Sequence, residues 1–169
     1  AIEGRSAGGL LIGACINQRP DLFKLAILGV PFVDVMNSMC DSTVPLTVIE
    51  WEEWGNPNEK KYFDYMLEYS PYDNIQKDTS HYPSLYITGG LHDPRVAYWE
   101  PAKFVARIRA RYTNQKTDEE KKHYFLMRLD MTSGHFSASD RYHYLKEMAY
   151  CYTYLIDQIC DGGEGKERE

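Results

Sequence analysis

Three short apolar segments alternate with longer helical patterns, and this alternation limits the possible folds more than any other feature of the sequence. The apolar segments are residues 25–30, 84–88 and 124–129. Each is too short for a helix and is bounded by turn-forming or charged residues, as is typical of a buried parallel strand. Helical patterns cover residues 7–18, 58–69, 98–112 and 140–160. The alternation predicts an α/β fold, with a mostly parallel sheet and helices on both faces.

The composition argues against several classes of protein. Hydrophobic residues make up 43% of the 169 residues, which is enough for a packed core and argues against a disordered chain. The 25 acidic residues outnumber the 19 basic ones, whereas a general nucleic-acid-binding protein needs a basic face. No apolar run approaches the roughly 18–20 residues that span a bilayer. We therefore expect neither a nucleic-acid partner nor membrane insertion.

The four cysteines favour a reducing compartment. They are widely spaced, without a Cys-x-x-Cys pair or histidines at zinc-ligand spacing, so we expect no metal site. Two disulfides are formally possible, but the apolar neighbours of the cysteines favour buried thiols. Because no secretory signal is visible either, we expect a cytoplasmic protein.

Two polar segments lie outside the predicted core elements. Residues 113–122 (TNQKTDEEKK) read as a solvated surface connection. Residues 161–169 (DGGEGKERE) are rich in glycine and charge, which predicts a disordered tail. We therefore expect the folded unit to be residues 1–160, with the length of one medium domain or of one part of a larger one.

The stretch from Gly4 to Gly8 matches the pattern G-x-S-x-G, with Ser6 at its centre. In this motif a strand turns sharply into a helix and presents the serine at the corner. The pattern alone is weak, and a flexible Gly-Ser terminus is the alternative. The helical pattern that follows at once favours the sharp turn. The first turn of that helix would direct backbone N–H groups at an oxyanion, with the Ala7 N–H as the natural donor.

A serine nucleophile needs a base, and the base needs an orienting carboxylate. Asp93 comes directly after the predicted strand 84–88, and His135 comes just after the strand that ends at residue 129. The chain order Ser, Asp, His is that of α/β-hydrolases, and both intervals leave room for a strand–helix–strand crossover. The other four histidines precede strands, lie within a helix or adjoin Asp93. Asp93 and His135 are therefore the candidate acid and base.

An acidic and aromatic segment, Glu50-Trp51-Glu52-Glu53-Trp54, stands between these motifs. If it is extended, the side chains of Glu50 and Glu52 project to one side and could bind a guanidinium or ammonium group. From the residues alone, a solvated run of charges is the favoured interpretation. Arg95 has two alternatives, a salt bridge at a helix start and a contact with substrate.

Six sequence blocks extend these observations along nearly the whole chain. They are EGRSAGGLL, RPDLFKLAILGVPFVDV, EWEEWGNPNEKKYFDYM, SPYDNI, GLHDPRVAYWEPAK and SGHFSASDRY. In this order they closely resemble the catalytic domain of the oligopeptidase B branch of the prolyl oligopeptidase family of serine peptidases. The resemblance implies the C-terminal part of an α/β-hydrolase fold. It also implies that the family's N-terminal strands and β-propeller are absent from these 169 residues.

The resemblance assigns roles that agree with the residues themselves. It implies Ser6 as nucleophile, Asp93 as orienting acid and His135 as general base, acting through an acyl-enzyme without metal or organic cofactor.

The resemblance also implies a substrate class. Glu50 and Glu52 would recognise Arg or Lys on the acyl side of the cut bond, and Arg95 would bind the substrate's backbone carbonyl. The expected partners are short peptides containing Arg or Lys.

Two other functions stay open. One is another α/β-hydrolase chemistry, such as that of an esterase, which has no use for Glu50 and Glu52. The other is a non-catalytic fragment, because the absent segments include the family's second oxyanion donor. We expect the 169 residues alone to be unstable, aggregation-prone or inactive, with the missing segments of the parent chain as their partners.

Overall fold

The computed structural model describes residues 1–112, 123–136 and 141–160. The predicted surface connection 113–122 and the predicted tail 161–169 lie outside this range, as does residue 140. In chain order the elements are β1 (Ile2–Arg5), α1 (Ala7–Gln18), a 3₁₀ turn (Pro20–Leu22), β2 (Leu25–Gly29), α2 (Val35–Cys40), α3 (Thr47–Trp54), α4 (Lys60–Tyr69), β3 (Ser84–Gly90), α5 (Trp99–Arg111), β4 (Phe125–Asp130) and α6 (Arg141–Cys160).

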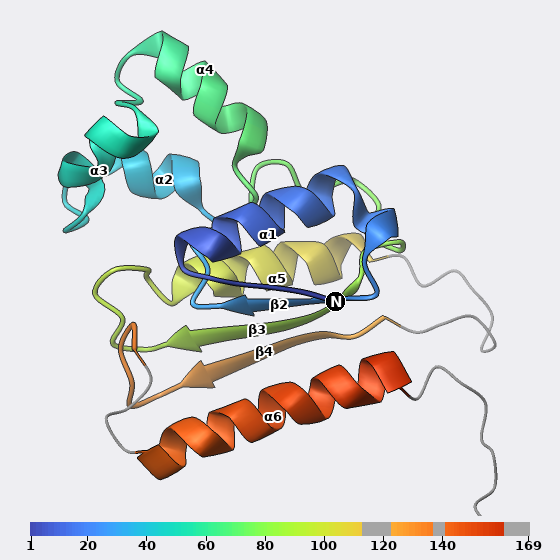
Figure 1. The fold of residues 1–169 in the computed structure, drawn as a ribbon. Helices are drawn as coiled ribbons and strands as arrows, with labels where there is room; N and C mark the ends of the chain where they lie inside the picture. The colour runs from blue at the N-terminus through green and yellow to red at the C-terminus, as the bar shows by residue number, and fades with distance from the viewer. Residues whose placement is uncertain (113–122, 137–140, 161–169) are drawn as a thin grey trace, which may run out of the picture.

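The four strands form one parallel sheet in the order β1-β2-β3-β4. Helices α1 and α5 cover one face of the sheet, and α6 lies on the other (Figure 1). This arrangement confirms the predicted α/β fold with helices on both faces. The functional loops of such a sheet lie at the carboxyl ends of its strands, so β1, β3 and β4 all direct their last residues to one edge.

The core explains why the central strands are apolar on both faces. Side chains on one face, including Leu28, Leu85 and Ile87, pack with Ile16 and Phe104 from the covering helices. The other face contributes a smaller cluster, which joins the sheet to α6 and consists of Leu25, Ile27, Tyr86, Cys151 and Tyr154. Burying a large aliphatic or aromatic side chain stabilises a fold by about 1.5–3 kcal/mol, so the larger cluster dominates.

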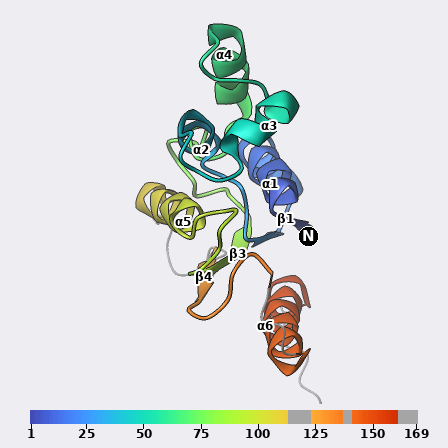
Figure 2. The same cartoon turned by 90° about the vertical axis from the view of Figure 1, so that its left-hand side faces the viewer.

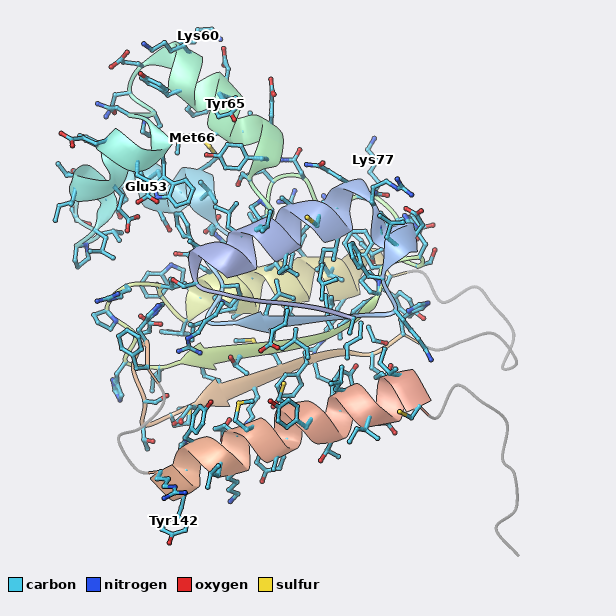
Figure 3. The ribbon with its side chains drawn as sticks, viewed as in Figure 1. Glu53, Lys60, Tyr65, Met66, Lys77 and Tyr142 are labelled. Carbon is cyan, nitrogen blue, oxygen red and sulfur yellow. The ribbon has the colours of Figure 1, made fainter. Side chains whose placement is uncertain are left out.

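Helices α2, α3 and α4 form a separate helical lobe, residues 35–69, beside the α1 face (Figure 1). The lobe has its own apolar cluster, in which Val35, Met39 and Met66 are fully buried. Leu10 of α1 and Val96 before α5 belong to the same cluster and connect the lobe to the sheet layer. Figure 3 shows Lys60 of α4 pointing away from the rest of the molecule.

Several sequence-based expectations need correction. Residues 50–54 are not extended, because they belong to helix α3. A fourth strand, which is not among the predicted ones, precedes Ser6: Ile2–Arg5 pair in register with β2. Strand β3 continues two residues past its predicted end.

The four cysteines are free, as expected, but their burial differs from the expectation. Only Cys151 is buried, whereas Cys40 and Cys160 are exposed. Within the described ranges, no helix is both long and apolar enough to cross a bilayer.

Candidate active site

Ser6 lies at a sharp corner between β1 and α1. Its backbone has φ 54° and ψ −119°. Residues other than glycine rarely adopt such a left-handed conformation, which costs about 1–3 kcal/mol of folding free energy. The Ser6 N–H donates to the carbonyl of Gly29 at 2.9 Å, and its carbonyl accepts the N–H of Gly9 at 2.8 Å. This is the strand–turn–helix context that the sequence motif requires.

The glycines flanking Ser6 have different roles. A Cβ on Gly4 would collide with the backbone carbonyl of Gly8 and would lie 2.5 Å from Ile12 Cγ1. Gly4 therefore permits the close approach of β1 to α1. A Cβ on Gly8, in contrast, would meet no atom within 4 Å. Gly8 faces open space in the turn that follows the serine.

Asp93 and His135 form a buried hydrogen-bonded pair. His135 Nδ1 lies 2.7 Å from Asp93 Oδ2, and the two side chains are 6% and 0% exposed. The other carboxylate oxygen, Oδ1, accepts the backbone N–H groups of Arg95 and Val96 at 2.8 and 2.9 Å. With Nδ1 committed to the carboxylate, Nε2 is the ring atom that can exchange a proton. This orientation is the one a general base needs.

Asp130, which the sequence reasoning did not single out, organises the turn that carries His135. Its Oδ1 accepts the backbone N–H groups of Thr132 and Ser133 at 2.8 and 3.1 Å, and its Oδ2 lies 2.6 Å from His143 Nε2 on α6. Burial alone would raise the pKa of Asp130. The hydrogen bonds lower this pKa by a larger amount, so it lies well below its usual range. In the sequence, this turn could have been recognised from an aspartate at the end of a predicted strand that is followed by Thr and Ser, because such residues often cap a turn with their side chains.

The corner and the His135 turn are also connected. The guanidinium of Arg5, the residue before Ser6, donates to the backbone carbonyl of His135. The structure thus joins Asp93 and His135 directly and links the Ser6 corner to them through Arg5.

A small pocket, here called the Ser6 pocket, opens beside the serine. It is lined by Ser6, Ala7, Phe32, Leu46, Glu50, Trp54, Arg95 and Val96. Its walls come from the corner, from α3 and from the segment after Asp93. Three predicted site residues that are distant in sequence, Ser6, Glu50 and Arg95, therefore line one cavity.

Glu50 is the acidic residue of this pocket. Its Oε2 accepts a hydrogen bond from Trp54 Nε1 at 3.3 Å. Partial burial raises the pKa of the Glu50 carboxyl, while the Trp54 hydrogen bond and the charge of Arg95 oppose that rise. Arg95 is exposed, and its guanidinium carbon lies 5.2 Å from the centre of the Phe136 ring.

Glu52 does not share the position of Glu50. Two residues that are two positions apart on an α-helix are separated by a rotation of about 200° around the helix axis, so they lie on nearly opposite sides. Glu52 is exposed. The expectation that both side chains project to one side is therefore wrong, because it assumed an extended segment. Among the described residues, no three His, Cys, Asp or Glu side chains cluster as metal ligands.

Comparisons with known proteins agree on one family. The sequence model described as "Prolyl oligopeptidase family" matches residues 1–161. Protease 2 of Moraxella lacunata is 47% identical over 169 residues, which are 99% of this chain and 23% of that protein. Dipeptidyl aminopeptidase BI of Pseudoxanthomonas mexicana is 45% identical over 94% of this chain and 21% of its own length.

A solved structure supports the same relation. Oligopeptidase B from Leishmania major superimposes with a TM-score of 0.84 at 56% identity, covering 92% of this chain and 20% of that one. The chain therefore spans about a fifth of the length of the relatives it matches.

Proposed function

Because the chain belongs to the prolyl oligopeptidase family of serine peptidases, we propose that Ser6, Asp93 and His135 form the catalytic triad of an enzyme that cleaves short peptides after Arg or Lys. The observation that carries the substrate class is the Ser6 pocket, where the corner serine and the partly buried Glu50 line one cavity. The likeness to oligopeptidase B supports the same reading.

The proposed reaction is acyl transfer. His135 Nε2 takes the proton of the Ser6 hydroxyl as Oγ attacks the substrate carbonyl, and Asp93 stabilises the imidazolium that forms. The backbone N–H of Ala7, at the start of α1, donates to the developing oxyanion. His135 then gives its proton to the leaving amine. Water, activated in the same way, hydrolyses the ester to release the acid and restore the serine.

The proposed specificity rests on charge in a partly desolvated pocket. The Glu50 carboxylate would pair with the guanidinium or ammonium group of the substrate, and Phe32 and Trp54 would contact its apolar stem. Arg95, in the same pocket, would donate to a backbone carbonyl of the peptide. Glu52 is exposed on another side of α3, so the proposal assigns the cation to Glu50 alone.

The whole protein's partners and location are part of the same proposal. Short basic peptides are the proposed substrates. Because the relatives are about four to five times as long as this chain, further segments of the family's architecture are proposed partners of these residues. Four free cysteines fit a cytoplasmic location.

Two substitutions on α3 test the specificity. Glu50→Gln should lower kcat/KM for an N-acylated arginine amide about 30- to 1000-fold, because losing one partner of a desolvated charge pair costs about 2–4 kcal/mol. Glu52→Gln, the matched control two residues away, should change it less than about threefold. A neutral ester of the same length should be hydrolysed equally by both variants. Equal losses on both substrates after Glu50→Gln would refute the assignment.

The catalytic class needs its own measurement. In the longest expressed form of the chain, a neutral organophosphonate should label Ser6 in the wild type and should not label the Ser6→Ala variant. Cleavage of the N-acylated amide separates an endopeptidase from a dipeptidyl aminopeptidase, which requires a free amino terminus. Failure of the phosphonate to label Ser6 would contradict the triad, and a preference for short acyl esters would favour an esterase.

A further inference from the structure

A buried polar cluster joins α5 to α2 outside the proposed triad. Glu100, the second residue of α5, is 2% exposed, and Asp34, just before α2, is 1% exposed. Glu100 Oε2 accepts the backbone N–H of Asp34 at 3.0 Å, and its Oε1 accepts the hydroxyl of Ser38 at 2.7 Å. One carboxyl group therefore fixes the residue that precedes α2 and a residue one turn further along the helix.

The two buried carboxyl groups of this cluster differ in their charge partners. Asp34 Oδ2 forms an ion pair with Lys103 Nζ at 2.5 Å, and its Oδ1 accepts the side-chain amide of Asn37. Glu100 instead faces hydroxyl and backbone donors, with the charge of Asp34 nearby. Burial raises the pKa of Glu100 to about 7, and Asp34 adds to the rise. A buried carboxyl of this kind is costly, so packing alone does not explain it.

The cluster continues into the helix that carries Glu50. The backbone carbonyl of Ser38 accepts the hydroxyl of Thr47, the first residue of α3, at 2.7 Å. The indole N–H of Trp51, one turn further along α3, donates to the carbonyl of Met39 at 3.1 Å. The orientation of α3 therefore depends on α2, and α2 is fixed by Glu100.

The cluster also adjoins the catalytic elements. Two residues before Asp34, the N–H of Phe32 donates to the carbonyl of Ser6 at 3.0 Å. On the other side, α5 begins shortly after the segment that carries Asp93 and Arg95. Figure 2 shows α2 between α5 and α3 in the helical layer. Glu100 thus lies at the junction of three parts of the chain. They are the segment bonded to Ser6, the segment that carries Asp93, and the helical lobe.

We propose that Glu100 is a positioning residue for substrate specificity, which fixes α2 and, through Ser38 and Thr47, sets the distance between Glu50 and Ser6. It touches neither the substrate nor the reacting atoms. This inference rests on the proposed function, because it concerns the placement of Glu50 relative to the nucleophile.

A split between KM and kcat tests the proposal, measured on the longest expressed form of the chain. Glu100→Ala should raise KM for the N-acylated arginine amide about tenfold, the equivalent of about 1.4 kcal/mol. It should leave kcat for that amide, and both constants for the neutral ester, within about twofold. Glu100→Gln keeps one acceptor oxygen for the Asp34 N–H and should restore most of the loss. Glu68→Gln, on the exposed side of α4, is the matched control and should change nothing.

Three results would overturn the proposal. They are equal losses on the amide and the ester, an unchanged KM for the amide, and no difference between the Ala and Gln variants. If Glu100→Ala does not fold, Ser38→Ala can replace it, because it removes the hydrogen bond from the Ser38 hydroxyl to Glu100. This variant should raise KM for the amide alone, by about threefold. A loss of activity on both substrates would overturn the proposal. Failure of the proposed function is distinguishable, because it appears in the wild type as absent Ser6 labelling or absent preference for the arginine amide.

Discussion

At the scale of single residues, the site depends on how tightly Asp93 is fixed. Both of its carboxylate oxygens accept hydrogen bonds, one from His135 and the other from two backbone N–H groups. The side chain is fully buried, so its partners cannot be replaced by water without rearrangement. An acid held in this way can orient only one ring nitrogen of His135.

We therefore expect Asp93→Asn to lower kcat about 10³- to 10⁴-fold, as the loss of an orienting acid does in serine peptidases. The amide preserves the shape but donates to Nδ1, which places the proton of the imidazole on Nε2. KM for the arginine amide should change little, because the Ser6 pocket is intact. Asp64→Asn, which removes an exposed carboxylate of α4, is the control. A loss below about tenfold in kcat would show that His135 does not act through Asp93.

The triad candidates could be predicted from the sequence because Asp93 and His135 follow the ends of predicted strands and Ser6 lies at the centre of a G-x-S-x-G motif. Asp130 has a local signal of a similar kind, an aspartate at a strand end followed by Thr and Ser, but Glu100 has none. Glu100 occupies the first turn of an amphipathic helix, where an acidic residue usually interacts favourably with the helix dipole and with water. Its burial arises only when α2 packs over that turn, and no local pattern encodes this contact.

At the scale of elements, the turn from β1 into α1 sets the position of Ser6, the proposed nucleophile. The two glycines around Ser6 provide a matched pair of tests. Gly4→Ala should destabilise the chain by about 1–3 kcal/mol and displace Ser6, because its Cβ would collide with the carbonyl of Gly8 and crowd Ile12. Gly8→Ala meets no atom and should keep the stability or increase it by up to about 1 kcal/mol, since alanine favours a helix.

Urea unfolding followed by circular dichroism measures both effects. Phosphonate labelling of Ser6 gives an independent measure of the geometry of the corner, and we expect it to slow in Gly4→Ala. If the two variants unfold at the same urea concentration, the close approach of β1 to α1 is not what Gly4 provides.

Helix α3 shows where local sequence patterns fail. The residues TVIEWEEW contain β-branched and aromatic side chains and an alternation of acidic and aromatic residues, all of which suit a strand. Tertiary contacts reverse this preference, since the Thr47 hydroxyl and the Trp51 indole bond to carbonyls at the end of α2. The same contacts separate Glu50 from Glu52, so which of the two glutamates lines the Ser6 pocket could not be predicted from the local sequence.

At the scale of the whole molecule, the chain consists of a sheet layer and a helical lobe with separate apolar clusters. Proposed catalytic groups come from the sheet layer, whereas Glu50 comes from the lobe. The proposed specificity therefore requires that the sheet layer and the lobe keep one relative position. The apolar contacts of Leu10 and Val96 connect them, and Glu100 adds directional hydrogen bonds at the same junction.

The junction should give the stability of the chain a distinctive pH dependence. In the folded chain the pKa of Glu100 is raised from 4.5 to about 7, so between these pH values the folded state keeps a proton that the unfolded state releases. Its contribution to the free energy of unfolding is fully present below about pH 4.5 and is lost as the pH rises through 7. The glutamine in Glu100→Gln cannot ionise. Between pH 5 and 8 the free energy of unfolding of the wild type should therefore fall by about 2–3 kcal/mol relative to that of this variant. Urea unfolding at several pH values measures the difference, with Glu68→Gln expected to follow the wild type. Parallel stability curves for the wild type and Glu100→Gln would show that the carboxyl ionises normally and that the junction is not sensitive to its charge.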